Sequence, residues 1–201
     1  MALLSFYYGA MNSGKTIDLL KDAHNLEEKG YKVVIIKSSI DLKGNDTIVS
    51  RIGLSRKVDI LLSPTDSLAN HVSVYKDAAS ILVDEAQFLT EAQVDELWRI
   101  SKLADIPVNC YGLRTDFSTR LFEGSKRLFE LSDTFIELKT RCRCKEPATF
   151  NARLVNGEYV SEGESVVIDG INDEVAYEPL CGNDYIERVL KLKPKKKQKE
   201  N

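Results

Sequence analysis

Continuous runs of apolar residues recur along the first two thirds of the chain and are separated by longer stretches of mixed polarity. Four of these runs cover residues 3–8, 33–36, 81–83 and 108–113. Apolar runs of this length are typical of strands that are buried on both faces of a sheet. We therefore predict a strand at each of them, and a last sheet strand at residues 134–138.

Two of the intervening stretches have helical spacing. Apolar residues recur at intervals of three or four before Gly30, a candidate C-terminal cap, at Leu19, Leu20, Ala23 and Leu26. A second helix is predicted to begin at Thr90, because Gln93 three residues later completes a capping box. Strands alternating with helices predict an α/β fold, a mostly parallel sheet with helices on both faces.

The composition of the sequence changes near Lys139. Paired cysteines and scattered glycines follow, with short β-like pieces such as residues 165–168. We predict a first domain over residues 1–139 and a small cysteine-containing domain over residues 140–190. The lysine-rich residues 191–201 cannot bury surface, so we expect a solvated, disordered tail.

The composition of the chain limits the kinds of molecule that it is expected to bind. The chain has 28 basic and 31 acidic residues, a formal charge of −3, which gives no reason to expect nucleic-acid binding. Neither a long apolar span nor an export signal is visible, so we expect a cytoplasmic protein without a membrane role. The expected partner is a small molecule, and the four cysteines are expected to be reduced thiols or metal ligands.

A phosphate-binding loop follows the first predicted strand. The segment matches G-x-x-x-x-G-K-[ST] in full and consists of Gly9, Ala10, Met11, Asn12, Ser13, Gly14, Lys15 and Thr16. Its backbone N–H groups and the N-terminus of the next helix form a cradle for anions. Lys15 is predicted to bridge the β- and γ-phosphates of ATP, and the Thr16 hydroxyl to bind Mg²⁺.

Two carboxylates end the third predicted strand. Side chains of consecutive residues diverge as they leave a strand, so Asp84 and Glu85 can serve different groups. We assign Asp84 to the metal ion and Glu85 to the role of catalytic base. A kinase would direct Glu85 at a substrate hydroxyl, whereas an ATPase would direct it at water.

Four segments together resemble type II thymidine kinases, particularly the bacterial branch: GAMNSGKT, DEAQF, CYGLRTDF and RLVNGEY with the later EGESVVIDG. The resemblance covers nearly the whole chain. It implies a RecA-like P-loop domain and a small zinc-ribbon-like domain whose lasso loop covers the nucleoside. It also implies transfer of the ATP γ-phosphoryl group to the 5′-hydroxyl of thymidine or deoxyuridine, giving dTMP in the case of thymidine, in nucleotide salvage.

The resemblance assigns further site residues. Glu85 matches the family's catalytic base, and Asp84 and Gln87 fall in a segment counted with the ATP site. The residues implied to contact the nucleoside are Met11, Phe88, Leu113, Phe117, Phe122, Asn151, Val167, Ile168, Asp169 and Tyr177. From the residues alone, Met and Phe at such positions would be interpreted as core packing. Family likeness further implies a homotetramer and feedback inhibition by dTTP.

Three of the cysteines are spaced as the bacterial family spaces its zinc ligands. Cys142 and Cys144 form a C-x-C pair, and Cys181 is followed by Asp184 where relatives have Cys or His. Aspartate is an uncommon ligand in structural zinc sites. Three alternatives stay open: a zinc ion held by all four residues, a zinc ion held by the three thiolates and water, and a fold without zinc. Cys110 lies in a predicted strand and is expected to be a core residue.

A function of another class competes with the kinase. A P-loop ATPase or nucleotide switch with a protein-binding zinc domain would share the phosphate loop and the cysteines. Steady ATP hydrolysis without a nucleoside would favour that alternative.

Overall fold

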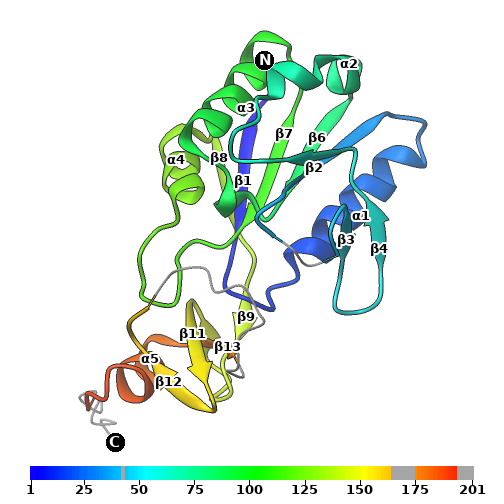
Figure 1. The fold of residues 1–201 in the computed structure, drawn as a ribbon. Helices are drawn as coiled ribbons and strands as arrows, with labels where there is room; N and C mark the ends of the chain where they lie inside the picture. The colour runs from blue at the N-terminus through cyan, green and yellow to red at the C-terminus, as the bar shows by residue number, and fades with distance from the viewer. Residues whose placement is uncertain (42–43, 164–174, 194–201) are drawn as a thin grey trace, which may run out of the picture. The chain divides into compact units, whose positions relative to one another are not determined.

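The computed structural model describes residues 1–41, 44–163 and 175–193 (Figure 1). Its strands are β1 (Leu4–Tyr8), β2 (Val33–Ser38), β3 (Thr47–Val49), β4 (Ser55–Lys57), β5 (Ile60–Leu62), β6 (Ser80–Asp84), β7 (Val108–Gly112), β8 (Thr134–Glu137), β9 (Thr140–Arg141), β10 (Pro147–Ala148), β11 (Phe150–Val155), β12 (Glu158–Val160) and β13 (Val175–Leu180). Its helices are α1 (Lys15–Glu27), η1 (Leu68–His71), α2 (Val72–Tyr75), η2 (Ala86–Phe88), α3 (Glu91–Leu103), α4 (Glu123–Leu131) and α5 (Gly182–Arg188).

The chain divides into two compact units. The first comprises Met1–Gly9, Gly14–Arg114 and Leu121–Leu138. The second comprises Ala10–Ser13, Thr115–Arg120 and the described part of Lys139–Asn201. Two short segments from earlier in the sequence, Ala10–Ser13 and Thr115–Arg120, therefore pack with the C-terminal part of the chain, an arrangement that the sequence pattern does not indicate.

The first unit is built on a six-stranded parallel sheet with the order β5-β2-β6-β7-β1-β8. Alternate side chains of its central strands enter two different cores. On one face Val34, Ile81 and Val108 pack with residues of α3 and α4, and on the other Ile35 and Leu82 pack with α1. Figure 1 shows the same division of the helices. The predicted α/β fold with helices on both faces is confirmed.

The predicted elements of this sheet are present with small shifts. All five predicted strands form, and α3 begins after Thr90 with the complete capping box. Helix α1 ends at Glu27, and Gly30 has φ +80° just beyond it, where its N–H donates to the carbonyl of Glu27. Cys110 is fully buried in the core, as predicted.

The second unit contains a three-stranded antiparallel sheet of order β12-β11-β13 and the small β9–β10 pair. Helix α5 packs on this sheet through Tyr185, which shares a small core with Ala152 and Leu180. The predicted β-like piece at residues 165–168 lies outside the described residues. Within the described ranges, none of the helices has the length and apolar character needed to span a bilayer.

Candidate active site

The loop between β1 and α1 has the backbone of a phosphate cradle. Gly14 has φ +81° and Asn12 has φ +65°, so the chain turns through left-handed conformations at both. The Ser13 N–H donates to the carbonyl of Ala10 (3.3 Å), and the Asp18 N–H closes the first turn of α1 on the carbonyl of Gly14 (2.9 Å). A Cβ at Gly14 would meet no atom within 4 Å, so its positive φ is what favours glycine there.

Lys15 is folded back onto this loop. Its Nζ donates to the carbonyl of Gly9 (3.3 Å), and the residue is 8% exposed. Burial lowers the pKa of the Lys15 ammonium below its ordinary value, and Arg51 adds to this effect, while Glu85 and Asp84 oppose it. Lys15 is therefore held in the field of both carboxylates that end β6, and Thr16 follows it in the first turn of α1.

The two carboxylates differ in environment. Asp84 is 5% exposed, and burial together with the charges of Glu85 and Asp41 raises its pKa to about 8. Glu85 lies at φ +49°, ψ +40°, a left-handed conformation that is uncommon outside glycine, asparagine and aspartate. Strained backbone of this kind is found preferentially at functional positions. The assignment of different roles to the two carboxylates stays a prediction.

Gln87 connects this turn to the end of β7. Its Nε2 donates to Oε2 of Glu85 (2.6 Å), and its Oε1 accepts from the N–H of Leu113 (2.9 Å). A Cβ at Gly112 would lie 2.9 Å from Oε1 of Gln87, so glycine leaves room for this bridge. Gln87, which we assigned to the ATP site, thus uses its side-chain amide to hold Glu85.

A buried lysine in β2 lies beside Asp84 in the sheet and was not among the predicted site residues. Lys37 is 1% exposed, and its Nζ lies 3.0 Å from Oδ2 of Asp41 and 3.1 Å from the carbonyl of Asn45. In the parallel register Lys37 pairs with Asp84, and the charge of Asp41 acts on Asp84. In the sequence, Lys37 directly follows the apolar run at residues 33–36. A charged residue at that position is also typical of an ordinary solvated strand end, so the sequence did not mark Lys37 as buried.

Three of the residues expected around the nucleoside lie in the first unit. Phe88 and Phe122 are half-buried and make an edge-to-face contact with ring centroids 5.8 Å apart. Leu113 is half-buried, and its carbonyl accepts from the Ser125 hydroxyl (2.5 Å).

Four more lie in the second unit. Asn151 is 4% exposed, and its amide is engaged with main chain: Oδ1 accepts from the N–H of Met11 (2.8 Å), and Nδ2 donates to the carbonyl of Thr115 (3.0 Å). Phe117 is 1% exposed, and Tyr177 accepts a hydrogen bond from Arg153. The expected main-chain contacts at Val167, Ile168 and Asp169 lie outside the described residues.

The cysteine cluster also belongs to the second unit. Candidate ligand atoms of Cys142, Cys144, Cys181 and Asp184 all lie within 4.8 Å of one another. The thiol of Cys142 donates to Oδ2 of Asp184 (3.1 Å), and the sulfurs of Cys144 and Cys181 are 3.5 Å apart. Burial raises the pKa of Cys142, and the bond to Asp184 adds to this, while backbone groups of Cys144 and Cys181 oppose it. The fold thus assembles a four-residue group that could hold a metal ion.

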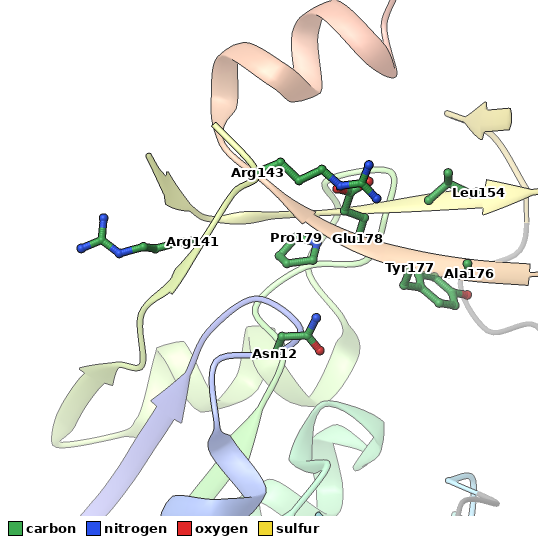
Figure 2. Close-up of a pocket in the computed structure, with 8 residues that line it drawn as sticks. All are labelled: Asn12, Arg141, Arg143, Leu154, Ala176, Tyr177, Glu178 and Pro179. Carbon is green, nitrogen blue, oxygen red and sulfur yellow. The ribbon is translucent and has the colours of Figure 1, made fainter. Parts of the chain in front are cut away.

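An open groove of about 370 Å³ lies in the second unit (Figure 2). Its lining includes Asn12 of the phosphate loop, Tyr177, and the two arginines that flank Cys142 in the sequence. Nε of Arg143 lies 2.5 Å from Oε1 of Glu178, whereas Arg141 donates to the carbonyl of Lys145 (2.9 Å) and points away in Figure 2.

Known proteins similar to this chain identify its family. The family model for thymidine kinase matches residues 2–185. The thymidine kinase of Enterobacteria phage T4 is 42% identical over 196 residues, covering 96% of this chain and all of that protein. The thymidine kinase of Lactiplantibacillus plantarum is 44% identical over 187 residues, covering 92% of this chain and 96% of that protein.

A solved structure of the replication initiator DnaA bound to AMPPCP and single-stranded DNA aligns with 71% of this chain and 41% of that chain, at 21% identity and a TM-score of 0.43. Sequence identity over almost the entire length, together with the family model, shows that this chain belongs to the thymidine kinase family.

Proposed function

We propose that this chain transfers the γ-phosphoryl group of ATP to the 5′-hydroxyl of thymidine and of deoxyuridine, yielding dTMP in the first case. The observation that carries the proposal is the placement of Glu85: a carboxylate in a left-handed turn at the end of β6, oriented by Gln87 and acting electrostatically on Lys15. A carboxylate fixed in this way can orient a hydroxyl and accept its proton.

The donor side of the site has the groups that a triphosphate requires. The loop's left-handed turns and the start of α1 favour bound anions, and Lys15 supplies a positive charge. Burial and the charges of Glu85 and Asp41 favour the protonated form of Asp84, and a divalent cation bound there would favour its ionised form. Thr16 and Asp84 would hold Mg²⁺, whose charge would neutralise the phosphates when bound.

The nucleoside contacts are assigned by family likeness. On that basis the residues that would contact the sugar and base are Phe88, Leu113, Phe122, Met11, Phe117 and Tyr177. The amide of Asn151 would act by holding Met11, because both of its ends bond to main chain. A nucleoside whose base does not match the hydrogen-bonding groups of the pocket would leave buried polar groups unpaired. Each unpaired group would weaken binding by about 1–3 kcal/mol.

The cysteine cluster fits zinc by its donor set and spacing. Zinc in a tetrahedral site with Zn–S bonds of about 2.3 Å places sulfurs roughly 3.8 Å apart. The 3.5 Å between Cys144 and Cys181 and the 4.8 Å limit on the whole group are compatible with that spacing. We propose that Cys142, Cys144, Cys181 and Asp184 hold a structural zinc ion that stabilises the second unit.

We base the proposed assembly and regulation on family likeness. The active form would be a cytoplasmic homotetramer that is inhibited by dTTP. Sedimentation velocity gives the assembly directly, and a monomer at micromolar concentration would contradict it.

The test of the function is an ATP-coupled assay over a panel of nucleosides. We expect turnover with thymidine, deoxyuridine and close 5-substituted analogues, because a pocket built for a pyrimidine excludes purines. Steady ADP release without any nucleoside would favour the ATPase alternative. Deoxyadenosine phosphorylated at a rate similar to thymidine would refute the assigned specificity.

A further inference from the structure

One face of β11 carries two buried polar side chains. Asn151 and Arg153 are two residues apart on this strand, so they project from the same face, and they are 4% and 3% exposed. Asn151 binds the loop segments at Met11 and Thr115 through its amide. This face therefore anchors main chain from two distant parts of the sequence.

The guanidinium of Arg153 lies against two aromatic rings. Its Cζ is 3.6 Å from the ring centroid of Phe117 and 5.6 Å from that of Tyr177. Its Nε also donates to the Tyr177 hydroxyl (3.1 Å), and the two residues are paired in the β11–β13 register. Both centroid distances are within the range of cation–π attraction, and a planar guanidinium can stack where an ammonium cannot.

The main chain at Gly163 lies near the guanidinium. Gly163 has φ +133°, and a Cβ there would lie 3.2 Å from Nη1 of Arg153 and 3.8 Å from Cζ of Phe117. The backbone at Gly163 thus packs closely on both partners. The same guanidinium therefore contacts both Phe117 and Tyr177.

We propose that Arg153 is a positioning residue for the nucleoside: by spacing and orienting Phe117 and Tyr177, it sets the affinity for the acceptor without contacting it. This inference rests on the proposed function, which assigns both rings to the nucleoside pocket. The guanidinium is anchored to acceptor-side groups, so its loss should weaken nucleoside binding and leave the use of ATP intact.

The test compares Arg153→Lys and Arg153→Met with Arg99→Met, a control at an exposed arginine of α3. Steady-state kinetics are measured with thymidine varied at saturating ATP, and with ATP varied at saturating thymidine. We expect KM for thymidine to rise about 10-fold to 30-fold in Arg153→Met, with KM for ATP and kcat changed by less than about threefold. The KM for thymidine of Arg153→Lys should be closer to that of Arg153→Met than to that of the unchanged protein.

Gly163→Ala provides a second route if Arg153→Met does not fold. The added methyl crowds Nη1 and strains the backbone, so a selective rise in KM for thymidine is again expected. An unchanged KM for thymidine in both Arg153→Lys and Gly163→Ala would overturn the proposal, as would equal losses toward thymidine and ATP. Absence of thymidine turnover in the unchanged protein would instead refute the proposed function, and the inference with it.

Discussion

The side-chain amide of Gln87 donates to the carboxylate of Glu85 over 2.6 Å. Gln87 is itself 2% exposed and accepts from the N–H of Leu113, so the donor is fixed in place by the end of β7. A hydrogen bond to a carboxylate restricts its rotation. Glu85 is therefore oriented before any substrate arrives.

Glu85→Gln should remove the proton acceptor and keep the shape of the side chain. We expect kcat to fall by about 10²–10⁴-fold, because general base catalysis contributes on that order. Binding of thymidine and ATP, measured by calorimetry, should change little. Retention of more than a tenth of the activity would contradict the assignment of Glu85.

Gln87→Leu should free the Glu85 carboxylate and leave the Leu113 N–H without its acceptor. We expect a loss of about 1–3 kcal/mol in the free energy of unfolding together with a fall in kcat of about 10-fold or more. Gln93→Leu is the matched control, because Gln93 is also buried and bonds to Ser63 and Asp66. It should lose stability and retain kcat, and equal loss of kcat in both variants would argue against a positioning role for Gln87.

Lys15→Met should remove the positive charge from the phosphate loop. A loss in kcat/KM for ATP on the order of 10²–10³-fold is expected, since one preorganised donor to developing charge has about that effect. Lys21→Met, at an exposed position on α1, is the control. Circular dichroism of both variants should match the unchanged protein, and similar ATP kinetics in both would refute the role of Lys15.

Asp184→Cys should convert the cysteine cluster into a four-thiolate site. We expect the unchanged protein to purify with about one equivalent of zinc and the variant to resist a chelator about 10-fold longer, because structural sites favour sulfur over carboxylate oxygen. Asp184→Ala should release zinc faster than the unchanged protein. Elemental analysis showing less than about a tenth of an equivalent in the unchanged protein would remove the zinc proposal.

Gly124→Ala should disturb the support of the catalytic turn. A Cβ there would lie 2.5 Å from the carbonyl oxygen of Ala86 and 2.7 Å from that of Leu89, both backbone atoms that cannot move freely. We expect destabilisation by about 1–3 kcal/mol in denaturant unfolding. In Gly182→Ala the nearest atom would be a side-chain carbon of Phe150 at 3.6 Å, an ordinary contact, and stability should be almost unchanged. Equal stability of the two variants would show that the close approach of α4 to η2 is not required.

Local patterns in the sequence predicted most of the central sheet. Four apolar runs predicted β1, β2, β6 and β7, because a strand buried on both faces has to be continuously apolar, and a further strand predicted at residues 134–138 is β8. The capping box at Thr90 predicted the start of α3. Family likeness added the identity of the nucleoside, which spacing alone does not specify.

Short elements were missed for a physical reason. Strands β3, β4 and β5 have three residues each, too few for their alternation to stand out from a loop. Lys37 was missed because a charged residue at a strand end is normally solvated, and only the fold encloses it with Asp41.

By itself, the sequence determined the candidate groups for the chemistry, because a phosphate loop, an acidic strand end and paired cysteines are encoded by near neighbours. Only the tertiary structure decided what orients them. Gln87 reaches Leu113 26 residues away, and Asn151 reaches Met11 140 residues away. The partner of such a side chain depends on which strands and loops the completed fold places together, and no local pattern records that choice.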